Sequence, residues 1–401
     1  MTPRITILNR LFWPRRFGGL ERVLWEYANA LADAGPHVHV VSEAIDGSPN
    51  EAQPRESLTI QRHKPVEFGR LWRVGEWLQV RWWQRALASA PPSDVVWANE
   101  PTAAVAAIRM GLASRLLYRP VFCYDGLTHA ARTIPEMAPL GRSLLARRLD
   151  RYAYRRAALV IQESHNLRQQ HTRFYGRRGR AIVVPNPAHA RSVPPSPRER
   201  FGLSAQHFVV GFVGRPGDPC KDLPFLIRAL KQQAMPDHTR LLVVGGGGGL
   251  DQARRWIADA GLGPRTIWTG DLADPAPAFA AMNALVLPSR FETFGNVIVE
   301  AHAHGLPALA RAADFTSIPP VFTASDELID NGVTGFVLDP HDPGELGAKL
   351  LLLAANPAFA RELGRTAKAR SASYTWPDAA ERYLQALGLD ISPTISPRLA
   401  A

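Results

Sequence analysis

The sequence has little cysteine and no long apolar run. Only Cys123 and Cys220 occur among 401 residues, which is too few for a disulfide framework. No stretch approaches the roughly 20 apolar residues that span a bilayer, and the first residues lack the features of a secretory signal. We therefore expect a cytoplasmic chain, able to lie peripherally on the inner face of a membrane.

Several motifs are absent as well. The sequence has no Asp-x-Asp pair to hold a divalent metal on a diphosphate, no Gly-x-Ser-x-Gly elbow and no Walker-type Gly-Lys-Ser/Thr. The loop after the first expected strand lacks Gly-x-Gly-x-x-Gly, which disfavours a nicotinamide dinucleotide. The pairs His37/His39 and His302/His304 have no evident third ligand, so we expect no metal and no other resident cofactor.

The positive charge is concentrated in the first half. The net charge is +11, and residues 1–190 carry 27 Lys and Arg against 15 Asp and Glu, whereas residues 191–401 carry 20 against 21. This asymmetry points to an anionic partner for the first half, such as nucleic acid, an acidic membrane surface or a phosphorylated acceptor.

Short β-rich runs alternate with helical patterns in both halves. This alternation predicts an α/β protein with parallel sheets and helices on both faces, and the length suggests two domains. We expect an N-terminal domain over 1–190, a proline-rich linker over 191–205, a C-terminal domain over 206–375 and a last helix over 376–388. Strands are expected at 5–8, 38–42, 94–98, 120–124, 159–162, 181–184, 208–213, 241–244, 266–269, 284–287, 307–310 and 335–338, and the first helix at 19–34.

Two carboxylates lie eight positions apart in the run 288–300. A buried strand is expected just before this run, and a helix is expected to begin near Phe294 or Gly295. Glu292 would then lie on the loop and Glu300 in the helix, on the order of 10 Å apart. The free N–H groups of a helix start favour an anion. The layout fits a nucleotide diphosphate sugar, with Glu300 at the ribose and Glu292 at the sugar; two solvated glutamates are the alternative.

Three other loops follow expected strands and could hold a phosphate. Gly18 and Gly19 come just before the first helix, where they would allow backbone to approach a ligand closely. Gly214 is followed by Arg215 and, six residues later, by Lys221, a pair of cations that suits a diphosphate. An ordinary turn and two solvated cations are the alternatives.

The third loop is the run of five glycines that contains Gly246. These glycines could pass backbone past a nucleotide, or they could form only a flexible turn.

Taken together, these motifs resemble the "group 1" family of retaining glycosyltransferases with the GT-B fold, over nearly the whole chain. The matching segments are Glu292–Glu300, Ala303–Pro307, Gly214–Lys221, Gly18–Arg22, Asn331–Phe336 and Tyr374–Trp376.

The resemblance implies two Rossmann-like domains that face a cleft and a last helix that crosses back to the N-terminal domain. It implies metal-independent transfer of a sugar, typically a hexose, from a nucleotide-diphosphate donor with retention of configuration. The donor would bind the C-terminal domain and a glycan acceptor the N-terminal one. The catalytic candidates are Glu292, Arg215, Lys221 and Asp125. The donor-binding candidates are Gly18, Gly19, Gly214, Gly246, Thr293, Phe294, Gly295, Asn296 and Glu300.

The chain departs from the family pattern in two places. Many members have a sugar-contacting His where this chain has Asp125, which could contact a sugar hydroxyl, act as a base or be a turn residue. A longer segment over 311–326 replaces the usual short Gly-Gly-x-x-Glu segment, and Glu327 is the candidate for its glutamate.

Tryptophan and arginine are concentrated in the segment 69–85, which holds four of the ten tryptophans. Leu71, Val74, Leu78 and Trp82 would share a helical face that packs on the core or lies on anionic lipid. A second cluster is formed by Arg142, Arg147, Arg148, Arg151, Arg155 and Arg156.

The basic half leads us to expect a lipid-linked or phosphorylated envelope glycan as acceptor, such as a lipopolysaccharide core. The alternatives are a soluble small-molecule acceptor, a catalytically silent GT-B scaffold that binds partners and a nucleic-acid binder, for which no recognisable module is present.

Overall fold

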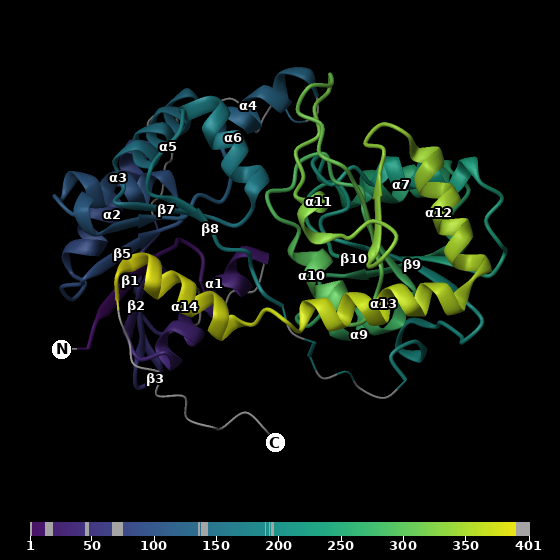
Figure 1. Ribbon diagram of the computed structural model, residues 1–401, viewed down its shortest axis with the longest axis horizontal. Coiled ribbons are helices and arrows are strands. Elements are labelled where there is room, and N and C mark those ends of the chain that lie inside the picture. The colour runs from purple at the N-terminus through teal and green to yellow at the C-terminus, as the bar shows by residue number, and fades with distance from the viewer. Residues whose placement is uncertain are drawn as a thin grey trace. The chain divides into compact units, whose positions relative to one another are not determined.

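The computed structural model divides the chain into two compact units, which we describe separately (Figure 1). Unit 1 contains residues 1–129, 140–186 and 376–401, and unit 2 contains residues 130–139 and 187–375. The residues that the structure describes are 2–12, 19–44, 48–65, 75–134, 137, 143–188, 190–191, 193 and 196–389.

Unit 1 is built on an eight-stranded sheet in the order β3-β4-β2-β1-β5-β6-β7-β8. Neighbouring strands are parallel except for β3 and β4. Central strands such as β5 are buried along their whole length, as expected where helices cover both faces. The strands are β1 (Arg4–Leu8), β2 (His37–Glu43), β3 (Glu51–Arg55), β4 (Leu58–His63), β5 (Val95–Ala98), β6 (Leu116–Tyr118), β7 (Leu159–Gln162) and β8 (Ala181–Val183).

Helices connect most of these strands, and the last helix of the chain returns to the same unit. Tyr383 of this helix is fully buried, and its ring lies 4.8 Å from that of Tyr27 and 4.7 Å from that of Trp97. The expected return of the C-terminal helix to the N-terminal part is confirmed. The helices are α1 (Gly19–Asp33), α2 (Gly75–Ala88), α3 (Pro101–Arg109), α4 (Tyr124–Thr133), α5 (Leu144–Arg156), α6 (His165–Tyr175) and α14 (Trp376–Leu387).

The strand expected at 120–124 is wrong. The chain pairs into the sheet four residues earlier, as β6, and α4 begins at Tyr124. Pro120 has no N–H group to donate to a ladder, so a central strand does not continue through it. The strands β3 and β4 were not expected; β3 is almost wholly exposed and has no apolar pattern, whereas β4 alternates buried and half-buried residues.

The tryptophan-rich segment lies partly outside the described residues, since its structure is given only from Gly75 onward. The described part is α2, whose buried face carries Val80, Trp83 and Leu87. This face differs from the expected one, because Leu78 and Trp82 are only half-buried. The core-packing interpretation of α2 is therefore the one that the structure supports.

Unit 2 is built on a six-stranded sheet in the order β11-β10-β9-β12-β13-β14, and all of its strand pairs are parallel. The strands are β9 (Phe208–Val213), β10 (Thr239–Val244), β11 (Thr266–Gly270), β12 (Ala284–Leu287), β13 (Ala308–Arg311) and β14 (Gly335–Leu338). The helices are α7 (Leu223–Gln232), α8 (Leu250–Asp259), α9 (Ala276–Ala281), α10 (Asn296–Ala303), α11 (Ser325–Leu328), α12 (Pro343–Ala355) and α13 (Pro357–Ser371).

All six strands expected for this half are present within two residues of their predicted ends, and the two Rossmann-like units are confirmed. The packed part of unit 2 begins inside the expected linker, because Leu203 is 4% exposed and packs in the same core cluster as Val209. Among the described residues, no helix has the length and apolar character needed to cross a membrane.

Candidate functional site

The order of strands in unit 2 brings two functional loops together. The chain starts the sheet with β9, runs outward through β10 and β11, and then returns to place β12 on the other side of β9. Ligands of open parallel sheets bind beyond the carboxyl ends of the strands at such a switch point. The loops that follow β9 and β12 carry Lys221 and Glu292, and the Lys221 ammonium group contacts the Glu292 carboxylate.

The loop after β9 holds both predicted cations in a defined conformation. Arg215 is exposed over 69% of its side chain and forms an ion pair of 2.6 Å with Asp218. Asp218 also fixes the loop, since its carboxylate accepts from the Cys220 amide at 2.9 Å and its carbonyl accepts from the Lys221 amide at 2.9 Å. Lys221 is directed back over Gly214, where a Cβ would lie 3.6 Å from its side chain.

The run of five glycines packs its backbone against this loop. A Cβ at Gly245 would lie 2.1 Å from the Gly214 carbonyl oxygen, and a Cβ at Gly217 would lie 2.4 Å from the backbone of Gly249. The Gly246 amide donates to Asp271 at 2.9 Å. The glycines therefore allow two neighbouring post-strand loops to touch, a use of glycine that the sequence interpretation did not include.

The helix α10 begins at Asn296, close to the expected position, and Gly295 precedes it in the left-handed region (φ 107°). Phe294 is 2% exposed and anchors the turn in the core. Thr293 is half-buried, as are Asn296 and Glu300 in the helix. The N-cap residue Gly295 makes no side-chain cap, and the start of a helix is a place where an anion can bind.

A buried charge cluster lies beside these loops. The Asp222 carboxylate accepts from the Nε of Arg290 at 2.5 Å and from the Nη1 of Arg311 at 2.8 Å. Burial lowers the pKa of Arg311 to about 10, although Asp222 raises it. The sequence interpretation did not single out Asp222, because its partners are 68 and 89 residues away.

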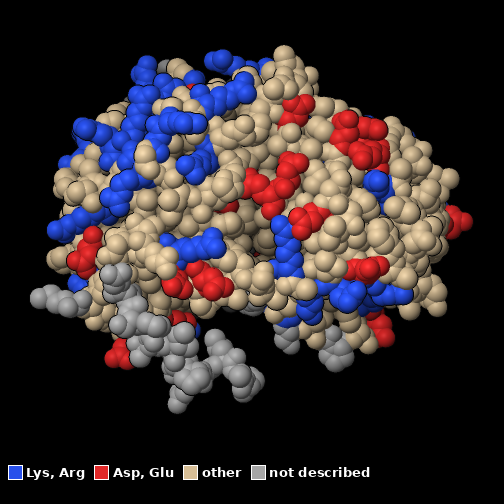
Figure 2. Space-filling model, viewed as in Figure 1, with Lys and Arg blue, Asp and Glu red and all other residues tan. Residues whose placement is uncertain are grey.

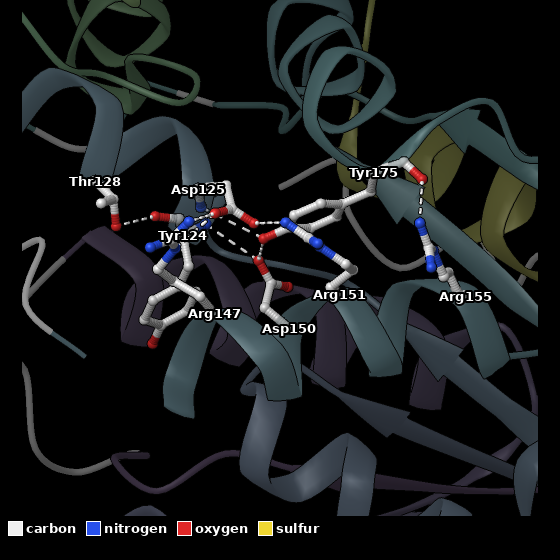
Figure 3. A network of polar contacts seen from close by, with 8 residues as sticks. All are labelled: Tyr124, Asp125, Thr128, Arg147, Asp150, Arg151, Arg155 and Tyr175. Atoms are coloured by element: carbon white, nitrogen blue, oxygen red, sulfur yellow. Dashed lines mark hydrogen bonds and ion pairs between the residues drawn. The ribbon is translucent and has the colours of Figure 1, made fainter. Parts of the chain in front are cut away.

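In unit 1, Asp125 lies in the first turn of α4 and is 4% exposed. Its carboxylate accepts from the Nε of Arg147 at 2.6 Å and from the Nη2 of Arg151 at 2.8 Å (Figure 3). Asp125 thus ties α4 to α5, and two members of the expected arginine cluster are not simply solvated. Its catalytic role stays a prediction.

A second buried carboxylate lies next to this pair. Asp150 accepts from the hydroxyl groups of Tyr118 at 2.6 Å and Tyr175 at 2.5 Å. The Cys123 sulfur, one carboxylate oxygen of Asp150 and one ring nitrogen of His171 all lie within 4.8 Å of one another. All three residues are buried. Burial raises the pKa of the Cys123 thiol well above its usual range. The three side chains therefore belong to a buried polar network in which the Asp150 carboxylate already accepts from two tyrosine hydroxyl groups.

The remaining candidates have simple positions. Gly18 lies outside the described residues, and Gly19 is the exposed first residue of α1. His302 is 3% exposed, and burial lowers its pKa to about 4. His304 stacks on Phe279 at a ring separation of 5.5 Å. Both histidines therefore pack within unit 2.

The sequence interpretation also overlooked Glu100, which lies two residues after the end of β5. In unit 1, β1 and β5 are adjacent. The strands β2 to β4 lie on the β1 side of this pair, and β6 to β8 lie on the β5 side. The Arg10 amide donates to the Glu100 carboxylate at 3.2 Å. Burial raises the pKa of Glu100, and Arg10 partly opposes this. A polar Asn-Glu after an apolar strand was the available signal.

Two family models match the chain. The model described as "Glycosyl transferases group 1" matches residues 207–356, and "Glycosyltransferase Family 4" matches residues 17–191. Each model falls largely on one of the two units, and together they include every strand of both sheets except β1.

Named relatives include D-inositol 3-phosphate glycosyltransferases. One from Catenulispora acidiphila is 33% identical over 199 residues, which cover 47% of this chain and only 45% of that relative. One from Stackebrandtia nassauensis is 26% identical over 412 residues, which cover 95% of this chain and 89% of the relative. The relative with the higher identity is therefore aligned over less than half of its own length.

Solved structures share the fold at low identity. Sucrose-phosphate synthase from Thermosynechococcus elongatus has a TM-score of 0.81 at 20% identity, covering 96% of this chain and 98% of that one. Anabaena HepE in complex with UDP-glucose has a TM-score of 0.73 at 22% identity, covering 96% of this chain and 99% of that one. The chain thus shares the two-domain fold of these solved structures.

Proposed function

Because the chain belongs to the group 1 glycosyltransferases and has their GT-B fold, we propose that it transfers a sugar from a nucleotide-diphosphate donor to a phosphorylated acceptor. The observation that carries this proposal is the contact between Lys221 and Glu292 at the switch point of the unit 2 sheet. It pairs a cation for a diphosphate with an acceptor for a sugar hydroxyl, and the Glu292 loop leads directly into α10.

Each group has a chemical role in the proposed transfer. Arg215 binds the diphosphate bidentately, Lys221 binds it as a point charge, and the first amides of α10 donate to its oxygens. Glu292 accepts from a sugar hydroxyl and Glu300 from the ribose. Negative charge grows on the diphosphate as the glycosidic bond breaks, so donors that are held in place before the reaction stabilise the transition state.

We further propose that transfer retains the anomeric configuration and needs no divalent metal on the diphosphate. The two loop cations would supply the positive charge that a bridging metal supplies elsewhere. Product anomers resolved by NMR, and turnover measured with EDTA and with added magnesium, test these two statements. An inverted product or strict dependence on magnesium would contradict them.

The donor is expected to stabilise unit 2 against unfolding. UDP-, GDP- and ADP-linked sugars should be compared by thermal scanning, with UDP-glucose first because HepE, a protein of the same fold, was solved with it. A cognate donor at 100 times its dissociation constant should add about 2.7 kcal/mol to the free energy of unfolding. Mass analysis of the released sugar then identifies the group transferred. If no donor stabilises the protein or is turned over with any acceptor, the proposed function is wrong.

The acceptor side of the proposal rests on the basic surface of unit 1. Figure 2 shows Lys and Arg side chains gathered on the visible face where Figure 1 places α5 and α6. The only acidic residue in either helix is Asp150, which is buried. An acid-free cationic face suits a phosphorylated acceptor and an anionic membrane surface. The exposed arginines of these helices are Arg148, Arg151, Arg155, Arg156, Arg168 and Arg173.

We expect this face to bind anionic vesicles. The double variant Arg148→Glu/Arg156→Glu should lower the affinity for vesicles of phosphatidylcholine and phosphatidylglycerol by at least tenfold at 0.1 M salt, since about 1 kcal/mol per basic residue is lost. Cosedimentation with the vesicles measures this affinity. Arg361→Glu/Arg365→Glu on α13 makes the same change in net charge in unit 2 and should have little effect. Equal losses in both variants, or no binding by the wild type, would contradict a membrane role.

Two acceptor classes remain to be compared. We propose a lipid-linked or phosphorylated envelope glycan, such as a lipopolysaccharide core. The relatives' name favours a second candidate, a soluble phosphorylated polyol such as D-inositol 3-phosphate. Transfer to the soluble acceptor without vesicle binding would select the second. Binding of nucleic acid at moderate salt without sugar transfer would instead favour a binding protein.

A further inference from the structure

Asp222 occupies a backbone conformation that L-residues rarely adopt. It directly follows Lys221 and precedes α7, and its φ of 44° lies in the left-handed region. Among the described non-glycine residues, only Ser196 shares a positive φ. Aspartate tolerates this region better than most residues but usually caps the helix that follows it. Asp222 makes no such cap.

The Asp222 carboxylate instead binds two arginines from other segments. Arg290 belongs to the loop after β12, two residues before Glu292, and Arg311 ends β13. The side chains of Asp222 and Arg311 are only 6% and 3% exposed. The Arg311 guanidinium also lies over the Phe225 ring, 4.3 Å from its centre. The carboxylate is therefore the shared partner of two guanidinium groups, which are too buried for water to hydrate them fully.

Backbone hydrogen bonds run alongside these ion pairs. The Arg290 amide donates to the Cys220 carbonyl at 2.8 Å, and the Glu292 amide donates to the Phe322 carbonyl at 2.7 Å. The Asp222–Arg290 ion pair and the Arg290–Cys220 bond join the Lys221 loop to the Glu292 loop at side-chain and backbone level, and the Glu292–Phe322 bond holds the Glu292 loop to the segment after β13.

We infer that Asp222 is a positioning residue, which holds Lys221 and Glu292 in the relative position that donor binding requires. This inference rests on the proposed function for its effect on transfer, but the geometry that it predicts can be measured without activity. Asp222 would act through the two loops and would not itself contact the sugar or the diphosphate.

The test is Asp222→Asn, which keeps the shape and the tolerance for left-handed backbone but removes the charge. Amide hydrogen exchange at Arg290 and Glu292 should become at least tenfold faster, and kcat/KM for transfer should fall about 10- to 100-fold in the folded variant. Asp237→Asn, an aspartate of the same unit whose side chain is 99% exposed and pairs with Arg265, should change neither. Arg290→Gln removes only one of the two ion pairs of Asp222 and should shift the exchange rates and kcat/KM in the same direction. This variant tests the inference even if Asp222→Asn does not fold.

A double variant separates positioning from general stabilisation. In a Lys221→Met background, Asp222→Asn should lower kcat/KM by less than about threefold further, because residues that act as a unit are not additive. Unchanged exchange at both amides, or full additivity with Lys221→Met, overturns the inference. If exchange is faster in Asp222→Asn but the wild type transfers no sugar, the positioning role is supported and the proposed function is rejected.

Discussion

Lys221→Met is expected to lower kcat/KM for sugar transfer by about 100- to 1,000-fold, the range found when one preorganised donor to a developing negative charge is removed. Methionine keeps most of the volume and removes only the ammonium group that now contacts Glu292. The loss should appear mainly in kcat, because charge accumulates on the diphosphate as the bond to the sugar breaks. Steady-state kinetics with the cognate donor measure it.

Lys231→Met is the matched control for this prediction. Lys231 lies in the last turn of α7 in the same unit and is exposed, so the same substitution there should leave kcat and KM within about twofold of the wild type. Glu292→Gln should impair transfer in the same range, since the amide cannot replace the carboxylate toward Lys221 or a sugar hydroxyl. A folded Lys221→Met enzyme that stays within threefold of the wild type would remove Lys221 from the site.

Arg119→Met is expected to destabilise unit 1 by about 3–5 kcal/mol, the usual cost of leaving a buried charge without its partner. Arg119 is 1% exposed, and its Nη2 donates to Glu163 at 2.8 Å and to Asn186 at 2.9 Å. Its Nε donates to the Tyr383 hydroxyl on α14 at 3.0 Å. Burial lowers the pKa of Arg119, but Tyr383 and Glu163 raise it above its ordinary value, so the guanidinium stays charged.

Denaturant unfolding, monitored by hydrogen exchange in β7 and α14, measures this loss. Exchange in these elements reports on unit 1 even if the two units unfold separately. Arg55→Met is the matched control, since its ion pair with Asp33 is exposed (43% and 61%) and should cost at most about 1 kcal/mol. Arg119→Met/Glu163→Leu should recover part of the stability by removing the unpaired carboxylate. A loss below about 1 kcal/mol in Arg119→Met would show that this network does not anchor the last helix.

Much of the secondary structure could be predicted because its signals are local. The strand at 284–287 is a continuous apolar run closed by Pro288, and the final helix was expected from the spacing of its apolar residues, which matches α14. Local signals failed at 120–124, where the apolar pair before Cys123 suggested a strand. Which of two short apolar segments enters a sheet depends on the strands beside it.

The site was predicted as a set of residues but not as an arrangement. The motifs named Lys221 and Glu292 separately, and no sequence spacing indicates that they touch across 71 residues. The five glycines were interpreted as a ligand loop or a flexible turn, whereas Gly245 and Gly249 meet the backbone of the neighbouring loop. Asp222 and its arginines gave no signal, because ion pairs between distant segments leave no periodic pattern.

The sequence by itself determined the alternation of strands and helices, the presence of a last amphipathic helix and the family motifs, since each depends on residues a few positions apart. The tertiary structure decided the order of strands, which sets β12 against β9 and so joins the Lys221 and Glu292 loops. It also decided which charges are buried together, as for Asp222 with its arginines and Arg119 with Glu163. Strand order and charge burial follow from packing over the whole chain, and contacts of that range are not encoded in any short stretch.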